Sequence, residues 1–149
     1  MTSTCHVCRG DKLIDSLDSL SIYIEKGAPD NHKVTFKAAA DEYVNVRAGS
    51  IIVTIQEVPH ALFERKGNDL KLSMEISLQE ALLGFVRTIK HLDGHEVLVD
   101  RSNKVTKPGL ILRQKGEGMP VYQQYGDFGD LLITVVVQLP TELTPVQRE

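Results

Sequence analysis

Apolar and polar residues alternate along most of the chain in short runs, the period-two pattern of half-buried β-strands. Before residue 60 the pattern predicts three strands, at residues 20–24, 34–36 and 51–55. Turn residues such as Lys26-Gly27 follow the first run. After residue 94 the pattern predicts strands again, at residues 97–99, 110–112 and 131–139. The expected fold class is therefore mainly β.

The period changes in one stretch near the middle of the chain. Residues 70–76 alternate as a strand, and Ser77 is followed three residues later by Glu80, which is the spacing of a capping box at a helix start. Gly84 follows so soon that the helix must be short. We expect Gly84 to end this helix in the left-handed conformation, which a side chain would penalise.

A second alternating run follows the expected helix. It covers residues 85–92 and stops at Asp93-Gly94. This dipeptide suits a type I′ turn, in which both central residues have positive φ. The sequence therefore predicts a β-hairpin that turns at Asp93-Gly94.

The two halves of the chain resemble each other. The run SIIVTIQEVP in the first half matches DLLITVVVQLP in the second, and two glycine pairs also match, Gly27 with Gly109 and Gly49 with Gly129. No short period recurs, so the pattern indicates one duplicated β unit and not a solenoid. We expect two tandem small β-sandwich-like subdomains with a short helix near the start of the second.

Composition limits the classes of partner. The 149 residues are 42% hydrophobic and 25% charged, enough for one medium core or two small ones. A net charge of -3 and the lack of a dense basic patch argue against nucleic acid, and 5% aromatic content without Trp argues against a stacking platform. There is no run of eighteen apolar residues and no leader of charged then apolar residues. We therefore expect neither nucleic acid nor a membrane as a partner.

The N-terminal region contains two cysteines, Cys5 and Cys8, two residues apart. This spacing can present both sulfurs to one metal ion, but structural zinc takes four ligands. The sequence has no other cysteine. Cys5 and Cys8 are therefore expected to bind zinc only if partner cysteines lie upstream in a longer protein; the alternatives are a disulfide and two free thiols. No cofactor is expected in this chain by itself.

The histidines are the residues to consider for catalysis. His60, His91 and His95 lie near carboxylates in the sequence, a neighbourhood that would allow acid–base chemistry. However, His91 and His95 flank the expected hairpin turn, where polar residues are common, and no nucleophile or phosphate-binding motif is present. Asp127 and Asp130 are better explained as loop caps than as metal ligands. We predict that the chain is not an enzyme.

A series of motifs resembles a known family. The motifs are HALFERKGNDLKLSMEISLQEALLGFVRTIKHLDG, KPG, KGEGMP and GDL, in that order. Together they resemble the C-terminal substrate-binding region of DnaJ-type (heat-shock 40) co-chaperones of type I or the ER-lumenal branch, over nearly the whole chain. The resemblance implies three parts. They are a remnant of a Cys-rich zinc-finger-like region (1–12), the C-terminal part of peptide-binding subdomain I (13–67) and subdomain II (68–149).

The resemblance also implies a function. The family binds unfolded client polypeptides for a heat-shock 70 family chaperone, and physical reasoning agrees, because a free strand edge can pair with an extended chain while apolar side chains select its residues. Leu20 and Val53 fall on two cleft positions of the family, and Ile22 and Ile55 share their faces by alternation. The alternative for these four residues is simple core packing. The alternative function is a structural interaction module that docks a folded partner.

The resemblance implies parts beyond this chain as well. The chain has no J domain with its His-Pro-Asp motif. The homodimer of a full-length protein would form through a C-terminal segment that is absent here, because the chain stops at residues 145–149, where family members begin that segment. Zinc would be held only in the full-length protein. The HLDGHEV motif and the spacing from Cys5 to Leu20 favour the ER lumen, with the cytoplasm as the alternative. Where the family has a Gly-Glu turn, residues 38–41 contain alanines, which leaves that turn geometry open.

Overall fold

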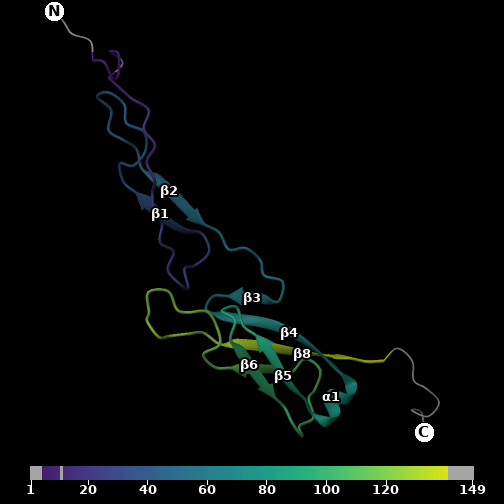
Figure 1. Ribbon diagram of the computed structural model, residues 1–149. Coiled ribbons are helices and arrows are strands. Elements are labelled where there is room, and N and C mark those ends of the chain that lie inside the picture. The colour runs from purple at the N-terminus through teal and green to yellow at the C-terminus, as the bar shows by residue number, and fades with distance from the viewer. Residues whose placement is uncertain (1–4, 11, 141–149) are drawn as a thin grey trace, which may run out of the picture. The chain divides into compact units, whose positions relative to one another are not determined.

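The computed structural model describes residues 5–10 and 12–140, shown as a ribbon in Figure 1. The described elements are β1 (His32–Phe36), β2 (Ile51–Ile55), β3 (Phe63–Lys66), β4 (Asp69–Ser77), α1 (Leu78–Leu83), β5 (Val86–Lys90), β6 (Glu96–Asp100), β7 (Ile111–Gln114) and β8 (Leu131–Gln138). The mainly β fold class and the short helix in the second half are confirmed. Within the described part, no helix has the length and apolar character needed to cross a membrane. Residues 145–149, where family members begin the dimerisation segment, lie outside the described residues.

The chain divides into two compact units, residues 1–58 (unit 1) and residues 59–149 (unit 2). The sequence placed the boundary between residues 67 and 68. In the structure β3 belongs with the second unit because it pairs antiparallel with β4, with Arg65 opposite Leu70. Gly67 lies in the tight turn that joins these two paired strands. The division between the units therefore falls before β3 and not at Gly67.

Unit 1 contains an antiparallel pair, β1 with β2, in which Val34 lies opposite Val53. Along both strands, half-buried residues alternate with exposed ones, as the sequence pattern predicted. The prediction of a strand at residues 20–24 is wrong, because residues 13–25 pair with no strand in the described part of the chain. Alternation alone does not make a strand when no neighbouring chain supplies hydrogen-bond partners.

Ala38 follows β1 and has a φ of 53°, in the left-handed region. This conformation costs an L-residue other than glycine about 1–2 kcal/mol. Ala38→Gly is therefore expected to raise the free energy of unfolding of unit 1 by about 0.5–1 kcal/mol, after subtracting the extra entropy of glycine in the unfolded chain. Urea unfolding followed by the methyl NMR signals of Val34 and Val53 measures this change.

The matched control is Ala39→Gly, because Ala39 is not among the residues with positive φ. At this position glycine only adds entropy to the unfolded chain, so we expect the free energy of unfolding to fall by about 0.5–1 kcal/mol. Equal losses for the two variants would contradict the assigned backbone strain at Ala38.

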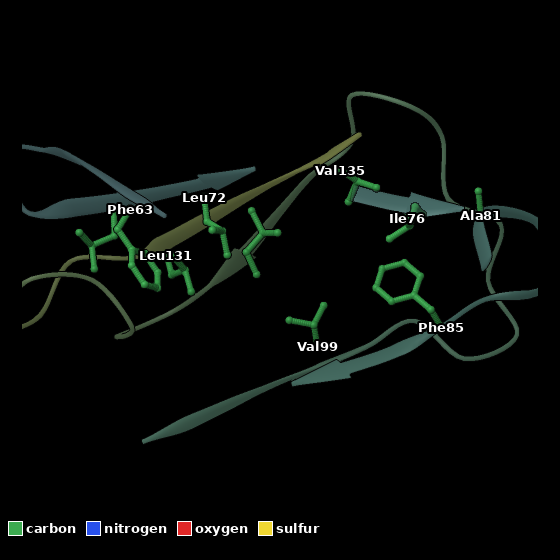
Figure 2. Close-up of a cluster of buried hydrophobic side chains, with 10 residues drawn as sticks. Phe63, Leu72, Ile76, Ala81, Phe85, Val99, Leu131 and Val135 are labelled. Carbon is green, nitrogen blue, oxygen red and sulfur yellow. The ribbon is translucent and has the colours of Figure 1, made fainter. Parts of the chain in front are cut away.

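Unit 2 contains a four-stranded sheet in the order β3-β4-β8-β7 and a separate two-stranded hairpin, β5-β6. The central pair β4 and β8 is parallel, whereas the outer pairs are antiparallel. Figure 2 shows side chains of the sheet pointing toward Phe85 and Val99, which come from the β5-β6 side. The buried cluster comprises Phe63, Leu70, Leu72, Ile76, Ala81, Phe85, Val99, Leu131, Ile133 and Val135. Unit 2 is thus a small sandwich with one apolar core.

The helix begins as the sequence predicted. The Ser77 side chain accepts a hydrogen bond from the Glu80 backbone N–H, and the Glu80 carboxylate accepts one from the Ser77 backbone N–H. Gly84 ends the helix with φ 94° and ψ 166°, so φ is positive but the expected left-handed helical conformation is wrong. A Cβ on Gly84 would also lie 2.4 Å from the Arg101 carbonyl oxygen. Both features require glycine here.

The β5-β6 hairpin forms, but not with the predicted turn. Gly94 has a φ of 94°, whereas Asp93 is not among the residues with positive φ, so the type I′ turn is wrong. The backbone N–H of His91 donates to the His95 carbonyl (2.8 Å), which leaves a loop of three residues. A glycine with positive φ at the end of such a loop is typical of three-residue hairpins.

The two units share part of their pattern, as the repeat predicted. Gly27 and Gly109 precede β1 and β7, and both have positive φ (83° and 76°). β1 then pairs antiparallel with β2, as β7 does with β8. The difference is at the second edge: β8 pairs there with β4, whereas β2 has no second strand among the residues that are described. The second edge of β2 is therefore open in the described part of the chain.

Asp130 acts as a loop cap, which confirms its interpretation from the sequence. Its carboxylate accepts a hydrogen bond from the Gly116 backbone N–H (3.1 Å) and contacts the Arg113 guanidinium. These hydrogen bonds, that of Arg113 first, lower the pKa of the Asp130 carboxyl group. The cap fixes the loop that carries Glu117 toward the β5-β6 hairpin.

Candidate functional site

The candidate client-binding surface lies on one face of β2. Val53 and Ile55 are two residues apart on this strand, so they point to the same side, and both are half-buried. On β1 they lie opposite Val34 and His32. The other face is solvent-exposed, with Ile52 60% exposed. One face of the hairpin is therefore apolar and only half-buried. A polypeptide packed on this face would bury it further.

Leu20 and Ile22 do not lie on a strand. They belong to the unpaired segment before β1, and their exposed fractions are 42% and 39%. The structure therefore brings Val53 and Ile55 together on one face, while Leu20 and Ile22 come from a different segment. None of these four residues belongs to the buried core, whose members all lie between Phe63 and Val135. Their role in binding stays a prediction.

Other apolar side chains of unit 1 are also exposed. Large exposed apolar groups that gather in one region are typical of interaction surfaces. The examples are Leu17, Tyr23, Ile24, Tyr43, Val46 and Val58. Unit 2 also exposes large apolar side chains, such as Leu83, Val105 and Leu139, but it has in addition the buried core that Figure 2 shows. The difference between the units is that none of the described apolar residues of unit 1 is fully buried.

Unit 2 contains a hollow of about 490 Å³ beside β3 and β4. Its lining includes Leu62 and Phe63, but also the charged residues Glu64 and Lys71. β3 is an edge strand of the four-stranded sheet, so its outer edge is open in the described structure. The mixed lining makes this hollow less selective for apolar side chains than the face of β2.

A cluster of polar side chains surrounds the loop of the β5-β6 hairpin. His95 Nδ1 lies 2.5 Å from Asp93 Oδ1, and His95 Nε2 lies 2.7 Å from Glu117 Oε2. His91 Nε2 lies 3.1 Å from the Glu117 carbonyl oxygen. The hydrogen bonds with Asp93, first, and with Glu117 raise the pKa of His95. The pKa of Asp93 is lowered, mainly because its carboxylate accepts a hydrogen bond from the His95 backbone N–H.

The sequence brought His91, Asp93 and His95 together but missed Glu117. Three residues at alternate positions around one turn are visible in the sequence, because a hairpin returns the chain on itself. Glu117 lies 22 residues after His95, and only the packing of its loop against the hairpin places it there. No local pattern in the sequence predicts this contact.

The two cysteines are free thiols, with Cys5 exposed and Cys8 partly buried. Hydrogen bonds from the backbone, that of Cys8 first, lower the pKa of the Cys5 thiol. A lower pKa favours the thiolate, which is the form that binds metal ions. The structure has no disulfide between Cys5 and Cys8, and zinc binding by this pair stays a prediction.

Comparison with known proteins identifies the family. The model of the DnaJ C terminal domain matches residues 10–140. The chain belongs to the DnaJ C-terminal domain family. The DnaJ homolog shv of Drosophila melanogaster is 41% identical over 148 residues, which is 99% of this chain and 42% of that protein. The DnaJ protein ERDJ3B of Oryza sativa subsp. japonica is 40% identical over 144 residues, or 97% of this chain and 41% of that protein.

A third DnaJ relative shows the same relation in length. The human DnaJ homolog subfamily A member 2 is 40% identical over 130 residues, which is 87% of this chain and 32% of that protein. The chain therefore spans less than half of the length of these DnaJ relatives. The family membership that the sequence motifs predicted is confirmed.

Proposed function

We propose that this DnaJ C-terminal domain is the client-binding part of a co-chaperone, which holds unfolded polypeptides for delivery to a heat-shock 70 family chaperone. The observation that carries the proposal is the half-buried apolar face of β2, next to a strand edge that has no partner strand among the described residues. The function is binding and not catalysis.

The physical basis is the chemistry of an unfolded chain. An extended polypeptide offers free backbone N–H and C=O groups, and an edge of the β1-β2 hairpin pairs with them regardless of sequence. Val53 and Ile55 then pack against apolar side chains of the client. A folded protein would keep such side chains in its own core. Leu20 and Ile22, which are exposed on the segment before β1, would offer further apolar groups to the client. The combination selects exposed apolar segments without reading one sequence.

The small binding unit implies modest affinity for the chain by itself. In unit 2, β4 covers the second edge of β8, whereas the equivalent strand for β2 does not occur in the described part of unit 1. The family resemblance implies that such strands precede Cys5. We propose that the whole protein completes the cleft and binds clients more tightly than this chain does.

Further partners are proposed for the whole protein. It would form a homodimer through a C-terminal segment of the longer protein, and it would hold zinc through Cys5, Cys8 and upstream cysteines. The lowered pKa of the Cys5 thiol supports the zinc ligand role. The HLDGHEV motif supports residence in the ER lumen, with the cytoplasm as the alternative.

Val53→Asp tests the binding face. A carboxylate on this face would lose its hydration when a client covers it, so we expect the affinity for an unfolded polypeptide to fall at least about tenfold. The probe is a fluorescent, reduced and carboxymethylated polypeptide that stays unfolded, and fluorescence anisotropy measures its binding. Leu20→Asp is expected to act in the same direction.

Ile52→Asp is the matched control, because Ile52 is the neighbouring residue on the opposite, exposed face of β2. It adds the same charge and is expected to leave the affinity within about twofold. Equal losses for both variants, with both still folded by circular dichroism, would contradict the assigned face. If the unchanged chain bound no unfolded polypeptide at all, the alternative of a module that docks a folded partner would stand instead.

A further inference from the structure

We infer that the loop of the β5-β6 hairpin is a zinc-binding site, with His91, Asp93 and His95 as protein ligands and Glu117 as the residue that orients both imidazoles. One ligand atom from each of the first three residues lies within 4.8 Å of the others. This site is separate from Cys5 and Cys8 and from the client-binding face, and it lies wholly within unit 2.

His91 is the residue that points most directly to a cation. Its side chain is only 9% exposed, and its Nε2 lies 3.1 Å from the Glu117 carbonyl oxygen, which can only accept a hydrogen bond. Nε2 therefore carries the proton, so in the neutral ring Nδ1 is a bare acceptor. Nδ1 is buried without a hydrogen-bond partner and lies 3.4 Å from another acceptor, Asp93 Oδ1.

An unpaired acceptor that faces a carboxylate is unfavourable unless a cation lies between them. Metal-binding histidines characteristically donate the other ring N–H to a carbonyl or a carboxylate, which fixes the tautomer. His91 has this arrangement already, with the Glu117 carbonyl as the acceptor. A metal ion bound to Nδ1, or an additional proton on it, would give this nitrogen the partner that it lacks.

His95 can supply the second nitrogen. Its Nε2 lies 2.7 Å from the Glu117 carboxylate, which forms the outer part of a carboxylate–histidine–metal arrangement. Its Nδ1 shares a hydrogen bond with Asp93 at 2.5 Å. On binding, the metal ion takes the place of the proton between Nδ1 and Asp93, and that proton leaves to solvent.

The ligand atoms, which lie within 4.8 Å of one another, reach zinc distances after small side-chain movements. With Zn–N and Zn–O bonds of about 2.0–2.2 Å, tetrahedral ligand atoms lie about 3.3–3.6 Å apart. The distance from His91 Nδ1 to Asp93 Oδ1 is 3.4 Å, within this range. The 2.5 Å from His95 to Asp93 must widen by about 1 Å. The side chains of His95 and Asp93 are 43% and 67% exposed, so they have room to move.

The ligand types favour zinc over the harder cations. Two imidazoles with one carboxylate are typical zinc ligands, whereas calcium and magnesium prefer oxygen ligands. The hairpin places the two rings side by side, because His91 and His95 pair across the three-residue loop, with ring centroids 4.7 Å apart. With three protein ligands, a water molecule from solvent completes a tetrahedral site.

The test uses this chain with Cys5→Ser and Cys8→Ser, so that the thiols do not bind the added metal. Isothermal titration with zinc chloride is expected to give one bound ion per chain. Nitrogen-15 NMR of the imidazoles is expected to show zinc-dependent shifts at Nδ1 of His91 and His95, with Nε2 still protonated. His95→Gln is expected to weaken zinc binding at least about tenfold, and Glu117→Gln by about tenfold.

Two matched controls complete the test. Glu96→Gln removes a charge beside His95 without removing a proposed contact, and His32→Gln removes a histidine of unit 1; both are expected to keep the zinc affinity within about twofold. Circular dichroism verifies that each variant is folded, and His95 is exposed enough to be replaced without opening the core. The inference is overturned if no zinc binds, if His95→Gln binds it equally well, or if His91 Nδ1 takes up only a proton.

Discussion

Gly129→Ala is expected to destabilise unit 2 by at least about 3 kcal/mol, or to prevent its folding. A Cβ at this position would lie 2.0 Å from the Asn68 carbonyl oxygen and 2.4 Å from its carbonyl carbon. The backbone of Asn68 cannot yield easily, because its carbonyl accepts a hydrogen bond from the Met119 N–H at 2.8 Å. The substitution therefore breaks the junction of three chain segments. Urea unfolding followed by circular dichroism measures the loss.

Gly116→Ala is the control for Gly129→Ala. Gly116 has a φ of 74°, but a Cβ there would meet no atom within 4 Å. Only the backbone conformation is penalised, and the expected loss is about 0.5–1 kcal/mol after the lower entropy of alanine in the unfolded chain is taken into account. If Gly129→Ala cost no more than Gly116→Ala, the close approach of the three segments would be wrong.

Ile133→Ala is expected to lower the free energy of unfolding of unit 2 by about 2–5 kcal/mol. Ile133 is fully buried in the middle of β8, where it lies opposite Leu72 of β4 and Leu112 of β7. Truncation removes apolar contacts and leaves a cavity between strands that cannot close without disturbing two ladders. Urea unfolding measured at equilibrium gives the difference from the unchanged chain.

Ile111→Ala provides the comparison for Ile133→Ala, since Ile111 is 59% exposed on the neighbouring edge strand β7. The same three carbon atoms are removed, but most of them already contact water, and the expected change is within about 0.5 kcal/mol. Similar losses at both positions would contradict the core that the sheet and the β5-β6 hairpin enclose.

Local patterns predicted much of unit 2. The alternation from Leu70 to Ile76 gave the correct buried face, and the spacing of Ser77 and Glu80 gave the correct helix start, because both depend on residues close in sequence. The parallel pairing of β4 with β8 was not predicted. It joins residues about sixty positions apart, and alternation is the same for parallel and antiparallel neighbours.

Other errors have the same origin. The run at residues 20–24 alternates like a strand, yet a ladder requires a partner chain, which the pattern of one segment does not specify. Asp93-Gly94 fits a type I′ turn by composition, but the pairing of His91 with His95 selected a longer loop. For the candidate sites, the sequence named Val53 and Ile55, and the structure places them on one face. Glu117 reaches the histidines only through folding.

The most direct measurement of client binding is an NMR titration of the isotope-labelled chain with an unfolded, carboxymethylated polypeptide. Backbone amide and methyl signals report each residue separately, so the experiment maps the contact and does not only detect it. The proposal predicts the largest shifts at Val53, Ile55, Leu20 and Ile22, with small changes in the core of unit 2. Shifts confined to the hollow beside β3, or no shifts at client excess, would contradict it.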